Sequence, residues 1–143
     1  MENQLVKKTQ ALLKENGLRK TIIREEVLGL FLKHPTALSH GEIEEQFDGR
    51  FDRVTIYRTL KSFEEKGLIH RVIDDGAVVK YAACSTGCSE HSHQDDHVHF
   101  KCVECRQTVC LHDVPVQGFN LPRGYTATEY QLLITGICED CNA

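Results

Sequence analysis

Apolar residues in the first third of the chain recur at helical spacing, in separate stretches. Between Gln4 and Asn16 they form a helical stripe, and Gly17 then provides a natural stop. A second stretch follows Thr21, a residue suited to cap a helix, and ends at His34-Pro35. Two helices are therefore predicted, with apolar faces made of Leu5, Val6, Leu12 and Leu13 and of Val27, Leu28, Phe31 and Leu32.

A third, shorter helix is predicted from a capping signature. Ser39 and Glu42 have the spacing of a capping box, in which each side chain bonds the backbone N–H of the other residue. Ile43 and Phe47 follow and lie one helical turn apart. The three apolar faces together predict a small helical cluster.

The stretch FDRVTIYRTLKSFEEKGL at 51–68 predicts a helix with two different faces. Asp52 can cap this helix. Ile56, Leu60 and Phe63 fall within about 60° of one another at 100° per residue, which predicts a buried stripe. The opposite face carries hydroxyl, aromatic and cationic groups suited to phosphates and base edges, namely Thr55, Tyr57, Arg58 and Lys61.

The next stretch, LIHRVIDDGAVVKYA at 68–82, reads as two strands joined by a turn at Asp74-Asp75-Gly76. Helices followed by a basic helix and a hairpin predict a winged helix-turn-helix whose second helix enters the major groove of DNA. A helix with one polar face is more often simply solvated. The order of the elements, rather than the charge of one face, favours DNA binding.

Charge and composition divide the chain at about residue 83. The 143 residues carry a net charge of −4, with 14 basic and 13 acidic residues in 1–83 but 3 and 8 in 84–143. All seven cysteines and five of the eight histidines lie in the second part. This change predicts one domain over 1–83, a ligand-rich hinge over 84–96 and a metal-binding domain over 97–143. The expected fold class is α+β.

Composition also limits the class of protein. No apolar run reaches the roughly 20 residues that a membrane helix needs, and the first ten residues lack the apolar core of a signal peptide. A cytoplasmic protein that does not contact a membrane is expected. Because thiols stay reduced in the cytoplasm, seven cysteines indicate metal or redox chemistry rather than a disulfide scaffold.

Two CxxC pairs form the most specific motif in the chain. Cys102 and Cys105 are separated by 32 residues from Cys138 and Cys141, and two such turns can complete a tetrahedral four-sulfur zinc site. The alternative is a redox dithiol, which needs a helix directly after the motif to lower the thiol pKa. The flanking stretches 98–101 and 108–111 read as strands instead, so a structural Zn²⁺ is predicted.

Eight further ligand-type residues lie within 29 positions: Cys84, Cys88, His91, His93, His97, His99, Cys110 and His112. On a strand, His97 and His99 would face the same side, and Cys110 would come from the neighbouring strand. A histidine-rich stretch can also be a weak metal scavenger. The grouping predicts at least one further specific metal site but does not say which four residues build it.

With these motifs, nearly the whole chain resembles the Fur superfamily of metalloregulators. The resemblance rests on GLRKTIIR at 17–24, VTIYRTLKSFEEKGLI at 54–69, HVHFKCVEC at 97–105 and GICEDC at 136–141. It implies a homodimeric repressor that binds an inverted-repeat DNA operator while its sensing site holds metal. It also implies that Arg19 reaches the minor groove, that Tyr57 and Arg58 are recognition-helix contacts, and that His97 and His99 are regulatory ligands.

Two departures from the family pattern bear on the sensed metal. Cys110 stands where iron and peroxide sensors of the family usually carry a carboxylate, and Ala37 stands near where many supply a histidine. Thiolate and imidazole ligands suit zinc better than hard oxygen ligands do, so Zn²⁺ is favoured over Fe²⁺ as the regulatory metal. Pro115 and Pro122 argue against a helix over 112–124, so the dimer contacts are less well defined than the fold.

Other functions have less support. The chain lacks an HExxH helix and a deaminase-type HxE followed by PCxxC, so an enzyme is not expected, nor is a small organic cofactor. A zinc-storage or delivery protein would leave the winged helix without a role. The prediction is a zinc-responsive repressor, and the main alternative is an iron-responsive regulator of the same family.

Overall fold

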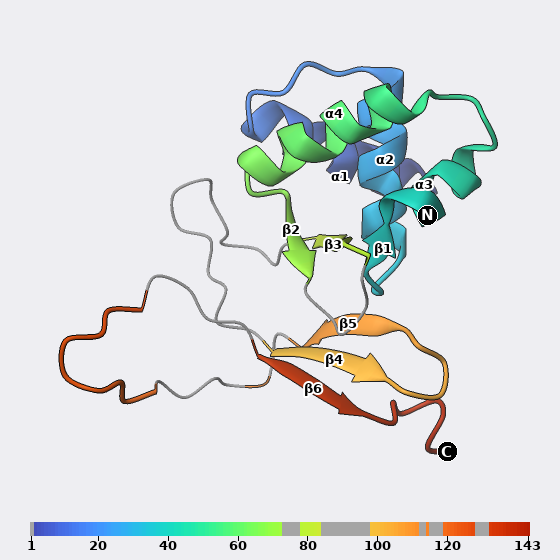
Figure 1. The fold of residues 1–143 in the computed structure, drawn as a ribbon. Coiled ribbons are helices and arrows are strands. Elements are labelled where there is room, and N and C mark those ends of the chain that lie inside the picture. The colour runs from blue at the N-terminus through green and yellow to red at the C-terminus, as the bar shows by residue number, and fades with distance from the viewer. Residues whose placement is uncertain (1, 73–77, 84–97, 112–113, 115–118, 128–131) are drawn as a thin grey trace.

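The computed structural model describes residues 2–72, 78–83, 98–111, 114, 119–127 and 132–143, and it has the expected α+β architecture (Figure 1). Four helices and two small sheets follow one another along the chain. In order they are α1 (Glu2–Glu15), α2 (Ile22–Lys33), β1 (Leu38–Ser39), α3 (His40–Phe47), α4 (Arg53–Glu65), β2 (Ile69–Val72), β3 (Lys80–Ala83), β4 (Val98–Cys102), β5 (Thr108–Leu111) and β6 (Leu133–Gly136).

The helix ends lie close to the predicted positions, because the capping residues make the expected bonds. Thr21 accepts a hydrogen bond from the Arg24 N–H, and Asp52 accepts one from the Thr55 N–H at 2.6 Å. Ser39 and Glu42 form both bonds of the capping box, each at 3.1 Å. These caps set where α2, α3 and α4 begin.

The predicted apolar face of α1 was wrong at one position. Val6 is 48% exposed, whereas Thr9 is buried and its hydroxyl donates to the Leu5 carbonyl at 2.8 Å. The reason is helical geometry, since Leu5, Thr9 and Leu13 are spaced four residues apart and share one side, while Val6 is turned about 100° away from Leu5. The buried face of α1 therefore includes a threonine whose polar atom is satisfied within the helix.

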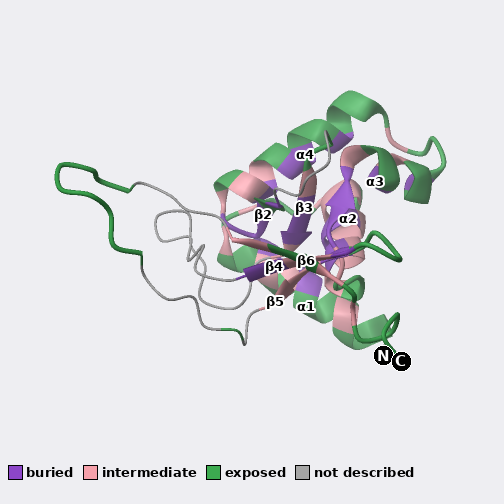
Figure 2. Ribbon diagram, turned by 60° about the horizontal axis from the view of Figure 1, so that its bottom comes forward, coloured by how far each residue is buried: buried purple, intermediate pink, exposed green. Residues whose placement is uncertain are grey.

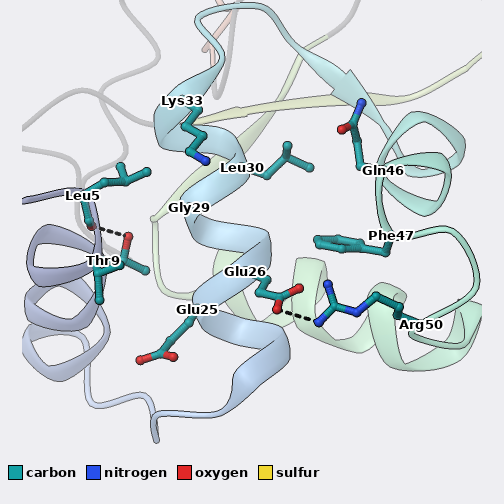
Figure 3. Close-up of a pocket in the computed structure, with 11 residues that line it drawn as sticks. Leu5, Thr9, Glu25, Glu26, Gly29, Leu30, Lys33, Gln46, Phe47 and Arg50 are labelled. Carbon is teal, nitrogen blue, oxygen red and sulfur yellow. Dashed lines mark hydrogen bonds and ion pairs between the residues drawn. The ribbon is translucent and has the colours of Figure 1, made fainter. Parts of the chain in front are cut away.

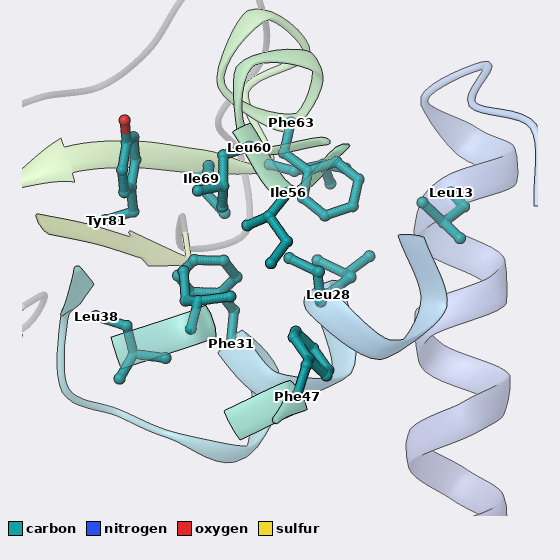
Figure 4. Packing of buried hydrophobic residues seen from close by; sticks show 13 residues of the cluster. Leu13, Leu28, Phe31, Leu38, Phe47, Ile56, Leu60, Phe63, Ile69 and Tyr81 are labelled. Atoms are coloured by element: carbon teal, nitrogen blue, oxygen red, sulfur yellow. The ribbon is translucent and has the colours of Figure 1, made fainter. Parts of the chain in front are cut away.

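The main core lies between the helices and the first sheet (Figure 4). Ile56, Leu60 and Phe63 of α4 are all buried, as their spacing predicted. They meet Leu28 and Phe31 of α2 in the same cluster. Figure 2 shows the burial of α2 and β3 and the exposed outer side of α4. The core therefore holds α4 by one face and leaves its opposite face in solvent.

The first sheet has the order β1-β3-β2 and is antiparallel throughout. Ile69 pairs with Ala83 and Val72 with Lys80, which confirms the predicted hairpin, although its turn at Asp74-Asp75-Gly76 lies outside the described residues. The helices α2, α3 and α4, followed by this hairpin, form a winged helix-turn-helix. The arrangement places β2 only a few residues after the end of α4.

The second sheet has the order β5-β4-β6, with β4 antiparallel to β5 and parallel to β6. It lies beside the first sheet, and the connection after α2 bonds to it directly. The Ala37 N–H donates to the Thr108 carbonyl at 2.7 Å, and Thr36 forms an isolated bridge with Val109. The two sheets are thus held against each other by backbone hydrogen bonding as well as by side-chain burial.

A surface pocket of about 370 Å³ opens between α1, α2 and the end of α3 (Figure 3). Its carboxylates already have partners, because Glu26 pairs with Arg50 at 2.7 Å and Glu25 accepts a hydrogen bond from Gln10 at 2.9 Å. No cysteine or histidine lines it. We therefore do not count it among the candidate metal sites. No helix in the described part of the chain has the length and apolarity to cross a membrane.

The capping box gives a test of this fold. Ser39→Ala should lower the free energy of unfolding by about 1 kcal/mol, because one N-terminal N–H of α3 loses its acceptor inside the protein. Ser39→Thr keeps the hydroxyl and is the matched control. Chemical denaturation of the three proteins measures the difference. An Ala variant as stable as the wild type, or a Thr variant as unstable as the Ala variant, would contradict the role of this cap.

Candidate functional site

The four CxxC cysteines converge at one end of the second sheet. Cys102 ends β4, and the chain turns so that Arg106, with a left-handed φ of 63°, donates its N–H to the Cys102 carbonyl at 2.9 Å. On the other side, Cys138 follows β6 closely, and its turn is closed by the Asn142 N–H on the Cys138 carbonyl at 2.9 Å. Each CxxC pair therefore forms a turn next to a strand end, as predicted.

A glycine lets β6 lie close enough to bring the second turn to the first. Gly136 pairs with Cys102 across the parallel strands, and a Cβ on Gly136 would lie 3.2 Å from the Phe100 ring. The Val103 N–H donates to the Gly136 carbonyl at 2.8 Å. Close packing at this residue thus sets the position of Cys138, which lies two residues further along the chain.

The thiol positions fit one tetrahedral ion. All four sulfur atoms lie within 4.8 Å of one another, and the Cys105 and Cys138 sulfurs are 3.9 Å apart. A tetrahedral Zn²⁺ with Zn–S bonds of about 2.3 Å requires sulfur atoms about 3.8 Å apart. This separation is much longer than a disulfide bond, and the five described cysteines are free. The four-sulfur set is therefore suited to hold a zinc ion.

Backbone donors favour a thiolate at this cluster. The N–H groups of Cys105 and Cys138 point at the Cys102 sulfur at 3.5 and 3.4 Å, and they lower the pKa of that thiol to about 6. The neighbouring sulfurs of Cys138 and Cys102 raise the pKa of Cys141 to about 12. One negative charge thus forms readily, whereas a full set of thiolates requires a cation to displace the remaining protons.

A second cluster lies where the two sheets meet. His99 and Cys110 face each other across β4 and β5, as predicted, and His70 of β2 joins them from the first sheet. The Nε2 atoms of His70 and His99 are 3.3 Å apart, and the Cys110 sulfur is 3.3 Å from His70 Nε2. Two imidazole ligands of a tetrahedral Zn²⁺ are about 3.3 Å apart, so this group also fits an ion of that size.

Burial defines the chemistry of this second cluster. His70 is 4% exposed and His99 is 6% exposed, and Ala37, Val72 and Ala82 form an apolar cluster against Cys110. Burial raises the pKa of the Cys110 thiol to about 12, so the thiol is protonated unless a cation is present. A bound metal would displace that proton and gain an anionic sulfur ligand in a site shielded from water.

His70 was missed by the sequence analysis, which treated it only as part of the wing hairpin. A usable signal was present in the strand. Ile69 on one side is apolar, and the other side carries His70 and the apolar Val72, so neither side is entirely polar. That pattern is typical of a strand covered on both faces. The predicted ligands Cys84, Cys88, His91, His93 and His97 lie outside the described residues, as does His112.

All five predicted DNA contacts lie on the surface of the winged helix-turn-helix. Thr55, Tyr57, Arg58 and Lys61 are exposed on α4, and Arg19 is exposed in the connection between α1 and α2. Asp52 at the start of α4 has a lowered pKa, chiefly because Thr55 donates hydrogen bonds to it and also because Arg58 is near. The carboxylate is therefore charged at neutral pH and occupied as the cap of α4.

Known proteins match this arrangement over nearly the whole chain. Residues 15–126 match the model of the Ferric uptake regulator family. The ferric uptake regulation protein of Staphylococcus epidermidis is 32% identical over 134 residues, which cover 90% of each chain. Among solved structures, holo XcZur is 22% identical with a TM-score of 0.68 and covers 98% of both chains. A zinc uptake regulator complexed with zinc and DNA is 18% identical with a TM-score of 0.65, covering 98% of this chain and 94% of that one.

The two solved structures support the fold, whereas the family match and the 32% identical relative define the class of protein. Members of this family regulate transcription in response to metal, so the expectation that the chain is not an enzyme is confirmed. The chain belongs to the ferric uptake regulator family and is a metal-dependent transcription regulator.

Proposed function

We propose that this regulator responds to zinc and that its sensing ion binds His70, His99 and Cys110. The observation that carries the proposal is the origin of these ligands, since His70 comes from the wing hairpin and the other two from the second sheet. An ion held by all three links the DNA-binding part of the chain to the part that carries the four cysteines. The cysteines Cys102, Cys105, Cys138 and Cys141 would hold a separate, structural Zn²⁺.

The position of β2 explains how metal binding would affect the proposed DNA-binding surface. Leu68 and Ile69 follow α4 directly and pack in the same core as Ile56 and Leu60. A metal bound to His70 holds β2 against β4 and β5, and through this core it restricts the direction of α4. A ligand that binds one arrangement of two parts better than the others shifts the population toward it. Metal occupancy would therefore favour the arrangement that fits DNA.

The ligand chemistry favours zinc over iron. Imidazole and thiolate ligands both suit zinc, whereas typical ferrous sites include a carboxylate oxygen beside their histidines. The ligand atoms of His70, His99 and Cys110 lie within 4.8 Å of one another, and among the described residues no carboxylate belongs to this group. The relative from Staphylococcus epidermidis is named for ferric iron and the solved structure bound to DNA is named for zinc, so both metals belong in the test.

The DNA partner would be an inverted-repeat operator, bound by a homodimer with one winged helix-turn-helix on each half-site. Residues 1–83 would form the DNA-binding domain, 84–96 the hinge and 97–143 the dimerisation domain, in the cytoplasm. Cys84, Cys88, His91, His93 and His97 stay predictions as further ligands of the sensing ion. Arg19, Thr55, Tyr57, Arg58 and Lys61 would contact the operator.

The structural zinc gives one test. Cys102→Ser should remove the tightly held zinc and unfold the second sheet, because Cys102 is buried between both CxxC turns and its two N–H donors would lose their anion. Elemental analysis and limited proteolysis measure both effects. Cys110→Ser is the matched control and should keep the tight zinc. A Cys102→Ser protein with full zinc content and unchanged protease resistance would contradict the four-thiolate site.

The sensing site gives a second test. His70→Ala should keep the tight zinc and the helical core but lose the rise in operator affinity on adding zinc, a rise we expect to be about 10- to 100-fold in the wild type. The control is His34→Ala, which removes an exposed histidine from the end of α2. DNA-binding titrations with and without zinc give the comparison. If the His70 variant responds to zinc as the wild type does, His70 is not a ligand of the sensing ion.

A further inference from the structure

The exposed face of α4 carries an apolar side chain near its N-terminal end. Val54 lies in the first turn of α4 and is 57% exposed. At 100° per residue it is about 160° away from Ile56, so it points almost directly opposite the buried stripe. One exposed valine needs no explanation on a protein surface. Val54, however, lies on the face of α4 that would enter the DNA groove, where an apolar side chain can contact a base.

The groups around Val54 identify what could cover it. Tyr57, Arg58 and Lys61 are exposed on the same side of the helix. Arg53 turns away from this side, because its guanidinium pairs with Glu44 of α3 at 3.3 Å. The nearest carboxylate further along this face is Glu65, about three helical turns from Val54. A cationic face with an apolar side chain is suited to an anionic partner that also presents an apolar group.

Duplex DNA is such a partner, and its apolar group is specific to one base. In the major groove, the C5 methyl of thymine is the apolar feature among the base edges, and small apolar side chains make contact with it. The first turn of α4 is held in place, since Asp52 fixes the Thr55 N–H at 2.6 Å. A β-branched valine there has few rotamers to lose on contact.

We propose that Val54 reads a thymine methyl in each operator half-site and so contributes to sequence specificity. This inference rests on the proposed function, because it requires that α4 enters the major groove. It assigns to Val54 a role separate from the polar contacts of Tyr57, Arg58 and Lys61. The valine would distinguish thymine from other bases through methyl burial, without a hydrogen bond.

A thymine-by-thymine test isolates this contact. The zinc-loaded full-length protein is used to select a duplex from a random pool, and each thymine of that duplex is then replaced by deoxyuridine, which removes one methyl. For the wild type, one replacement per half-site should weaken binding about four-fold, the effect of burying one methylene-sized group. Val54→Ala should weaken binding to the unmodified duplex by a similar factor and should be insensitive to that replacement.

Two controls accompany the test. Val6→Ala removes a 48% exposed valine from α1 and should leave affinity and deoxyuridine response unchanged. Arg58→Ala should weaken binding but keep the response to loss of the methyl. If Val54→Ala responds to every replacement as the wild type does, or if no thymine responds in the wild type, the methyl contact is overturned while operator binding stands. If the wild type selects no sequence with any metal, the proposed function fails as well.

Discussion

The sheet formed by β1, β2 and β3 packs against other parts of the protein on both faces, and the rest of the structure depends on this two-sided packing. One face carries Ile69 and Tyr81 into the helical core, and the other carries His70 and Val72 toward the second sheet. A short strand covered on both sides cannot move without disturbing both layers. The wing hairpin is therefore an element that mechanically connects α4 to the candidate metal ligands.

This arrangement would give different tasks to the two groups of candidate metal ligands. The four cysteines lie at one end of the second sheet, where a bound metal would connect β4 to the chain after β6 and compensate for the small apolar core of that region. His70, His99 and Cys110 lie at the contact between the sheets, next to the hydrogen bond from Ala37 to Thr108. A metal at the first group would stabilise one part, whereas a metal at the second would set the relation between two parts.

Local signals in the sequence predicted most of the elements and one metal site. Capping residues such as Ser39 and Asp52 located helix starts, because a cap depends on residues close in the chain. The four-thiolate cluster joins two CxxC pairs separated by 32 residues, and it could be predicted because one tetrahedral ion is completed by two such pairs. The two missed features have different causes. Thr9 shares one side of α1 with Leu5 and Leu13, and its burial was missed because a threonine was not counted on the apolar face. His70 becomes a candidate ligand only because β2 lies against β4 and β5, and no periodicity within a single segment contains that information.

The central claim is that zinc, bound through His70, His99 and Cys110, turns on DNA binding. The most direct test is an operator titration of the wild-type protein after loosely held metal is removed, with zinc and with ferrous iron added separately and bound metal counted by elemental analysis. The account predicts that zinc alone restores tight binding, with the occupancy of a second zinc per chain rising in parallel. Restoration by ferrous iron alone, or by zinc without a second bound ion, would contradict it.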